Sequence, residues 1–338
     1  MSESAFVDLE TIFGELEDSS ASHGLTYRRI YQSTELDVLV FVRGDPRLRG
    51  MTLELKKQLV PLPTIEGVKG LHTTVETKSE SVQWLTVEQV RLGDSSLFAI
   101  VVSDIARSCR ARPNELSRVA AERISKWRSF FTRSADGLSN KQQLGLVGEL
   151  HVLRRILAPA AGLDVAISTW HGPMSAVHDF SSKDWALEVK ATATNRGAVA
   201  RISSEQQLDP SDMSPLFLAF LAFDVRPFSE GQTLPQLVAD IRAAASALDT
   251  TQAATQFEDL LIDVGYLDLH QAKYGDHFTL KREEVFGIAE DFPSLRPANL
   301  PDEVSHVSYD LNTSLCQPWR VPLAHVTEKL AIGMSNES

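Results

Sequence analysis

The sequence predicts an α/β protein in which a β-rich N-terminal region precedes a core of helices and strands and an α+β C-terminal region. Residues 1–105 contain short alternating or apolar runs separated by turn residues, as expected for strands. Residues 140–157 carry leucines at helical spacing. Residues 216–223 form a continuous apolar run, which is typical of a strand buried on both faces. We expect domains at 1–110, 111–225 and 226–338.

In the N-terminal region we expect five strands, followed by one helix at 115–132 that Asn114 caps. Trp127 lies on the apolar face of this helix, and we interpret it as a core residue rather than a base-stacking one. The five expected strands are 25–31, 36–43, 51–55, 71–78 and 97–103.

A second helix is expected from about residue 139 to residue 157. Glu149 flanks its packed face, and Gly145 would permit close approach by another backbone. The packed face is marked by Leu146, Leu150, Leu153 and Leu157.

The segments that follow alternate between expected strands and helices. A short helix starting at Ser203 or Ser204 would carry Gln206 and Gln207. The expected strands of this part are 165–170, one beginning at Asp179-Phe180, 185–193, 216–223, 277–280, 284–288 and 304–311, and the other expected helices are 233–248 and 251–262.

Composition limits the function classes. No apolar run approaches the ~20 residues that span a bilayer, and the acidic N-terminus lacks the basic segment of a secretion signal. We therefore expect no membrane partner. Because only Cys109 and Cys316 are present, we expect a reducing, cytoplasmic location. The net charge of -12 argues against a generic DNA-coating protein. It does not exclude a nuclease, because local charge governs contact.

Two basic stretches are open to two interpretations. Between Arg107 and Arg133 there are eight Arg or Lys residues and two acids. Either stretch could follow a phosphate backbone, and either could be an ordinary solvated face. The second stretch consists of Arg43, Arg47, Arg49, Lys56 and Lys57.

The strongest chemical signal is Asp179, placed nine residues ahead of Glu188-Val189-Lys190. In a strand Glu188 and Lys190 share one face while Val189 points into a core. Carboxylates can ligate a hard divalent cation, and a lysine can orient water and screen phosphate charge. The alternative is that Asp179 caps a turn while Glu188 and Lys190 form a solvent-exposed salt bridge, which would contribute about 0 to 1 kcal/mol.

With His178 in place of the usual proline, this pattern resembles the signature of PD-(D/E)XK nucleases. Gly148-Glu149-Leu150 is similar to the helix acid of that superfamily, and residues 203–208 resemble the start of its glutamine-bearing helix. Residues 292–293 and 307–311 resemble a bacterial "PD-(D/E)XK motif protein" family that is associated with restriction-type defence gene clusters. The resemblance is specific over about residues 140–210.

The resemblance implies a restriction-endonuclease-like core, which is a mixed central sheet flanked by helices, and a Mg²⁺-dependent reaction in which Mn²⁺ can substitute. Asp179, Glu188 and the carbonyl of Val189 would bind the ion, and Glu149 would bind a second ion or a water of its shell. Lys190 would position the nucleophile. Gln207 is the expected active-site glutamine and Gln206 the alternate.

The expected substrate is DNA, contacted by Thr192, Thr194, Arg196 and His171. Expected partners are a second copy in a homodimer and the ATPase or methyltransferase subunits of a defence system. The sequence contains no P-loop, GxGxxG, HExxH, CxxC or GxSxG motif. Two alternatives stay open: a catalytically silent subunit that binds DNA or a partner protein, and a nuclease of the same fold that acts on RNA.

Overall fold

The structure is a computed structural model. The chain forms two compact units, Met1–Ala135 and Asp136–Ser338. We expected boundaries near residues 110 and 225, so both differ from the observed division. The structure describes residues 8–19, 24–32, 36–44, 47–56, 71–79, 82–90, 95–172, 177–194 and 197–335.

The N-terminal unit contains an antiparallel sheet with the strand order β1-β2-β3-β5-β4. The inward side chains of β2 alternate along the strand, so Val38, Val40 and Val42 are fully buried. Phe13 of α1 and Phe98 of α2 meet in the same core. The elements are α1 (Leu9–Ser19), β1 (Leu25–Gln32), β2 (Asp37–Arg43), β3 (Leu48–Lys56), β4 (Leu71–Ser79), β5 (Val82–Gln89), α2 (Ser95–Ala111) and α3 (Leu116–Arg133).

One strand prediction for this unit was wrong, because the segment 97–103, expected as a strand, lies in α2. Helix α1 and strand β5 were not predicted. Short apolar runs fit a buried helix as well as a strand, so the sequence pattern alone could not decide. The helix expected at 115–132 is confirmed as α3, but Asn114 does not cap it: Glu115 is the N-cap, without a side-chain hydrogen bond.

Trp127 is fully buried, which confirms its core role. Its indole nitrogen and the Arg123 guanidinium both donate to the buried carboxylate of Asp104, at 2.7 to 2.8 Å, and so tie α3 to α2.

Several arginines of the two basic stretches are held by acids: Arg43 by Glu88, Arg49 by Glu10 and Glu17, and Arg118 by Glu115 and Glu122. These ion pairs favour the ordinary-face interpretation.

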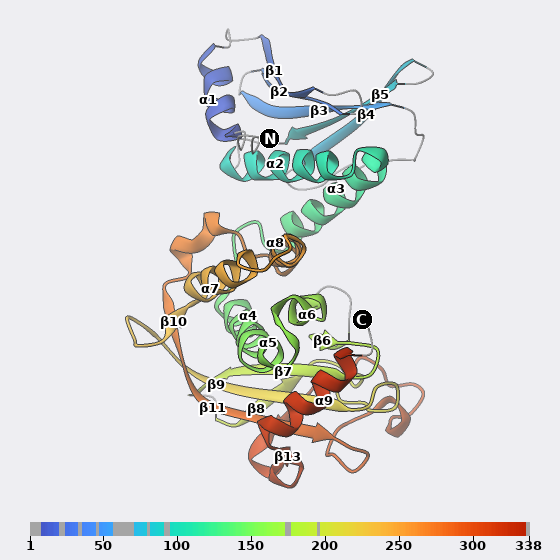
Figure 1. The fold of residues 1–338 in the computed structure, drawn as a ribbon, viewed down its shortest axis with the longest axis vertical. Coiled ribbons are helices and arrows are strands. Elements are labelled where there is room, and N and C mark those ends of the chain that lie inside the picture. Colours follow the sequence, from blue (N-terminus) through green and yellow to red (C-terminus); the bar gives the residue numbers. More distant parts are fainter. Residues whose placement is uncertain are drawn as a thin grey trace. The chain divides into compact units, whose positions relative to one another are not determined.

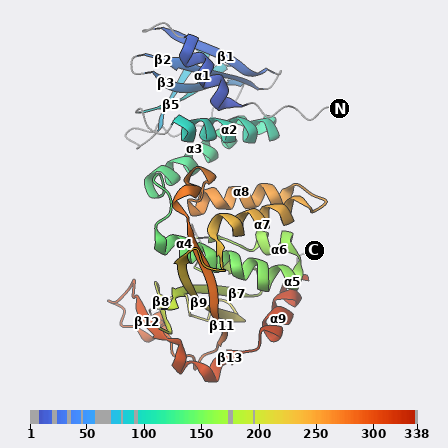
Figure 2. The same cartoon turned by 90° about the vertical axis from the view of Figure 1, so that its left-hand side faces the viewer.

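The C-terminal unit is built on a mixed sheet with the order β10-β11-β9-β7-β6, and β13 pairs with β11. Strands β7 and β9 are parallel, and the other pairs are antiparallel. Helices cover one face, and the small β8–β12 sheet lies over the other (Figures 1 and 2). The strands are β6 (Phe180–Ser181), β7 (Ala186–Ala193), β8 (Val199–Ile202), β9 (Leu216–Pro227), β10 (Gln232–Thr233), β11 (Asp276–Ile288), β12 (Tyr309–Asn312) and β13 (Arg320–Val321).

The arrangement is a mixed sheet flanked by helices, as the expected nuclease-like fold requires. Its helices are α4 (Asn140–Val152), which continues through a π-helical turn (Leu153–Leu157), α5 (Ala158–Ala161), α6 (Leu163–Ser168), α7 (Leu234–Ser246), α8 (Gln252–Val264) and α9 (Leu323–Ser335). Among the described residues, no helix is long and apolar enough to cross a membrane.

Several local predictions for this unit fail, and the strand expected at 304–311 begins only at Tyr309. Residues 165–170, expected as a strand, belong mostly to helix α6, and residues 205–208 form turns rather than a short helix. The strands expected at 277–280 and 284–288 are one strand, β11, with an irregularity between Leu280 and Arg282. Because β11 pairs with β9 along its length, the C-terminal region completes the same sheet, which explains the absence of a boundary near residue 225.

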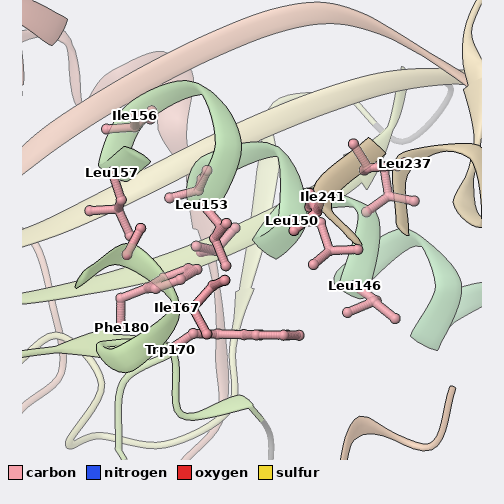
Figure 3. Packing of buried hydrophobic residues seen from close by; sticks show 14 of the residues in the cluster. Leu146, Leu150, Leu153, Ile156, Leu157, Ile167, Trp170, Phe180, Leu237 and Ile241 are labelled. Atoms are coloured by element: carbon pink, nitrogen blue, oxygen red, sulfur yellow. The ribbon is translucent and has the colours of Figure 1, made fainter. Parts of the chain in front are cut away.

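Helix α4 packs closely on β7. A capping box of Ser139 and Gln142 starts the helix. Figure 3 shows its Leu146 and Leu150, with Leu153 of the following turn, in the core cluster under the sheet. Gly148 faces β7 so closely that an added Cβ would lie 2.8 Å from the Cβ of Ala191.

Gly145 has nothing within 4 Å of such a Cβ, so the expectation that Gly145 permits the close approach was wrong. The close approach is made at Gly148, one residue before Glu149.

The two glycines of α4 provide a matched test. We expect Gly148→Ala to destabilise the protein by about 1 to 3 kcal/mol, because the new methyl group overpacks the contact with β7. Gly145→Ala should be neutral or stabilising by up to about 1 kcal/mol, because alanine favours the helix. Urea unfolding of the two variants measures the difference, and equal effects would contradict the packing described here.

Candidate active site

The edge of β7 carries the residues singled out from the sequence. Strand β6 pairs with β7 only at Phe180↔Leu187 and Ser181↔Ala186. Two positions beyond Leu187, the Val189 N–H donates to Asp179 Oδ2 at 2.7 Å. In a strand the N–H and C=O of one residue point to the same edge, so the Val189 carbonyl faces the side on which Asp179 lies.

Glu188 and Lys190 occupy the opposite face of β7 from Val189, as the period of two predicts. Lys190 Nζ lies 2.6 Å from Glu188 Oε1. Both side chains are withdrawn from solvent, with 1% of Glu188 and 15% of Lys190 exposed. The alternative of a salt bridge on a solvent face is therefore wrong. The two side chains instead form a contact that is withdrawn from solvent.

The second carboxylate oxygen of Glu188, Oε2, is buried and has no hydrogen-bond partner in the described structure. Burial and, second, the negative charge of Asp179 raise the pKa of Glu188 to about 8, against the opposing effect of Lys190. A buried acceptor without a donor is costly, since such groups are nearly always satisfied in folded proteins. Glu188 therefore offers an oxygen to a group that the polypeptide does not supply.

Two further carboxylates share this environment. Burial raises the pKa of Asp179, opposed by Lys190 and by the Val189 N–H. Burial, followed by the charge of Asp179, raises the pKa of Glu149 well above its ordinary value. Glu149 arrives from α4, and its Oε2 accepts a 2.8 Å hydrogen bond from Trp170 Nε1. Three acids and one lysine thus influence one another's charge in this part of the structure.

Gln207 completes the surroundings of Lys190. Its Oε1 accepts from Lys190 Nζ at 3.1 Å and from the Ser203 backbone N–H at 2.9 Å. Gln206 is exposed, so Gln207 is the glutamine of the site although its segment is a turn. His178 Nε2 lies 3.2 Å from the Gln207 carbonyl.

The predicted DNA contacts are less closely grouped. Thr192 follows Lys190 on the same face and is buried. Thr194 and His171 are exposed, and His171 Nε2 lies 3.2 Å from the Ser181 carbonyl. Arg196 lies outside the described residues. All four assignments stay predictions.

The oxygen donors of the site suit a hard divalent cation. Within the part of the chain that the structure describes, no three His, Cys, Asp or Glu side chains form a ready cluster around one ion. Mg²⁺ commonly binds through one or two carboxylates, with waters and substrate phosphates completing its shell. Asp179 together with the unpartnered oxygen of Glu188 meets that requirement, and Glu149 would then serve a second ion or a bound water.

Sequence reasoning missed Trp170, the donor to Glu149. Its only sequence signal is a tryptophan placed just before the Gly-Pro turn that leads to Asp179. The contact joins α4 to the end of α6, and no local periodicity reports a contact between these elements.

A mixed sheet with an acid beside its edge strand, Glu-Val-Lys on the next strand and a glutamate on the preceding helix defines the class of PD-(D/E)XK proteins. Over residues 9–314 the chain matches a family described as "Putative PD-(D/E)XK family member, (DUF4420)". The chain belongs to this family. No curated protein and no solved structure matches this chain.

The raised pKa of Glu188 predicts how stability depends on pH without divalent cations. Between its ordinary pKa of 4.5 and about 8, Glu188 is protonated in the folded chain and ionised in the unfolded chain. The free energy of unfolding therefore falls as pH rises through this window. Glu188→Gln should flatten that fall by up to about 1.4 kcal/mol per pH unit.

Urea unfolding at several pH values, with chelator present, measures this slope. Glu283→Gln is the control, because the hydrogen bond from His151 lowers the pKa of Glu283 and its contribution is lost in acid instead. Parallel curves for Glu188→Gln and the unmodified protein would contradict the assignment.

Proposed function

We propose that this protein is a Mg²⁺-dependent endonuclease that hydrolyses phosphodiester bonds of DNA in bacterial restriction or defence. The observation that carries the proposal is the buried Glu188–Lys190 pair, in which one carboxylate oxygen has no partner, next to the residue whose backbone N–H binds Asp179. Membership of a PD-(D/E)XK family supports a nuclease.

Asp179, Glu188 and the Val189 carbonyl would hold the cation, and Mn²⁺ could replace Mg²⁺. A cation bound there supplies charge stabilisation for the phosphate and lowers the pKa of a bound water. Glu149 would hold a second ion or orient a water in its shell. These groups are hard oxygen donors, which both ions prefer.

Lys190 positions the attacking water and screens the charge of the scissile phosphate. Its ammonium group is held between Glu188 Oε1 and Gln207 Oε1, so its direction is set before substrate arrives. Such preorganisation avoids reorienting the charge during the reaction.

Binding of the substrate would involve four further residues. Thr192 lies on the strand that carries Lys190, Thr194 and Arg196 follow in the sequence, and His171 lies in the segment that meets Asp179. Hydroxyl, guanidinium and imidazole groups are suited to phosphate contacts, which position a duplex without reading its sequence.

The proposal includes assembly and location. A homodimer would match the twofold symmetry of a DNA duplex, because two copies could cut the two strands. ATPase or methyltransferase subunits would supply translocation or modification, for which the sequence has no motif. A cytoplasmic location agrees with two cysteines that are both free and buried.

A second candidate function is a catalytically silent subunit that keeps the fold and binds DNA or a partner protein. It is favoured by one observation: among the described residues, no three potential ligands are gathered around a single point. The two functions differ in whether the site hydrolyses a bound duplex.

Cleavage of supercoiled plasmid with Mg²⁺ or Mn²⁺ separates the two candidates. We expect cleavage by the unmodified protein and a loss of at least about 100-fold in Asp179→Asn and in Lys190→Ala, because each removes a preorganised charge from the site. Asp240→Asn is the matched control, since Asp240 is a surface carboxylate paired with Arg154.

Binding of DNA without cleavage under both metals would establish the silent subunit instead. Equal activity of the Asp179→Asn and Asp240→Asn variants would contradict the site. Competition by structured RNA stronger than by duplex DNA would reassign the substrate to RNA.

The two adjacent glutamines test the surroundings of Lys190. Gln207→Ala removes the acceptor that holds the ammonium group, so the cleavage rate should fall about 10- to 100-fold, the range usual for groups that orient an active residue. Gln206→Ala changes an exposed side chain and should leave the rate unchanged. A larger loss in Gln206→Ala, measured in the same plasmid assay, would reverse the assignment.

A further inference from the structure

We propose that Trp170 is a positioning residue that fixes Glu149 relative to Asp179, and this inference rests on the proposed nuclease function. The side chain of Trp170 is hydrogen-bonded to Glu149, and its backbone pairs with the residue that follows Asp179. Its indole Nε1 donates to Glu149 Oε2 at 2.8 Å. Glu149 belongs to α4, whereas Trp170 follows the end of α6.

The backbone around Trp170 is joined to the segment that carries Asp179. Trp170 forms an antiparallel bridge with Phe180, the residue after Asp179. The His171 N–H donates to the Asp179 carbonyl at 3.0 Å, and the Ser181 N–H donates to the Thr169 carbonyl at 3.0 Å. These bonds hold Asp179 and the two residues after it against residues 169–171.

The indole ring has little freedom to move. Trp170 is 1% exposed, and its ring centroid lies 6.0 Å from that of Phe257 in α8. Figure 3 shows the ring within the hydrophobic cluster, near Ile167 and Phe180. Because close-packed side chains rarely change rotamer, the N–H donor has a defined position.

The chemistry of the donor explains the choice of tryptophan. An indole N–H donates one hydrogen bond and carries no charge. It can therefore orient the carboxylate of Glu149 without neutralising it, and leaves its negative charge available to a cation. A lysine or arginine in this place would itself be the counter-ion and would compete with the metal.

Trp185 provides a matched control in the same hydrophobic cluster. It is also fully buried, but its indole nitrogen has no hydrogen-bond partner in the described structure. Replacement of either tryptophan by phenylalanine removes similar apolar area. Only the change at position 170 removes a hydrogen bond to Glu149.

The test measures Mn²⁺ affinity of the full-length protein by electron paramagnetic resonance, beside plasmid cleavage and thermal unfolding. We expect Trp170→Phe to weaken Mn²⁺ binding by about 10-fold, as is usual when the partner of a ligand is removed. Trp185→Phe should bind Mn²⁺ like the unmodified protein. In the Glu149→Gln background, Trp170→Phe should have no further effect, because the two residues act as one unit.

The other outcomes would overturn either the positioning role alone or the proposed function as well. Equal Mn²⁺ affinity of Trp170→Phe and Trp185→Phe, or additive losses with Glu149→Gln, would overturn the positioning role while leaving the nuclease proposal intact. Absence of both Mn²⁺ binding and cleavage in the unmodified protein would overturn the proposed function and this inference with it. If Trp170→Phe does not fold, benzothienylalanine at position 170 keeps the ring shape without the N–H, and the same comparison applies.

Discussion

The buried contact between Glu188 and Lys190 is the interaction on which the site depends. A carboxylate withdrawn from water is strongly disfavoured unless its charge is compensated. Lys190 compensates one oxygen at 2.6 Å, whereas the other oxygen has no partner among the described groups. The same burial raises the pKa of Glu188 to about 8. A protein that only needed a stable core would gain from an apolar residue here, so the arrangement favours a role in binding a cation.

The fold creates this site by leaving one edge incomplete. Strand β6 pairs with only two residues of β7, and the carboxylate of Asp179 takes over where the pairing ends. Helix α4 packs closely on the face of β7 that carries Ala191, because Gly148 permits the contact. Glu149, the next residue, is thereby delivered beside the sheet. The short strand β6 and the glycine at position 148 thus help to bring together groups that are widely separated in the sequence.

Local patterns predicted this site better than they predicted the fold around it. Strand periodicity correctly separated Glu188 and Lys190 from Val189, and the resemblance of residues 203–208 to the family pattern indicated Gln207, which lies beside Lys190. Segments 97–103 and 165–170 were misassigned because short apolar runs fit helices and strands equally well. The pairing of β11 with β9 and the hydrogen bond from Trp170 to Glu149 join distant segments, so only the three-dimensional structure reveals them.

A crystal structure of the protein soaked with Mn²⁺, with anomalous data, tests the central claim most directly. The account predicts an anomalous peak about 2.0 to 2.2 Å from a carboxylate oxygen of Asp179 and from Glu188 Oε2, the distance usual for a small divalent cation and oxygen. Lys190 should still contact the other oxygen of Glu188. A fully occupied Mn²⁺ elsewhere, with no peak between Asp179 and Glu188, would contradict the account.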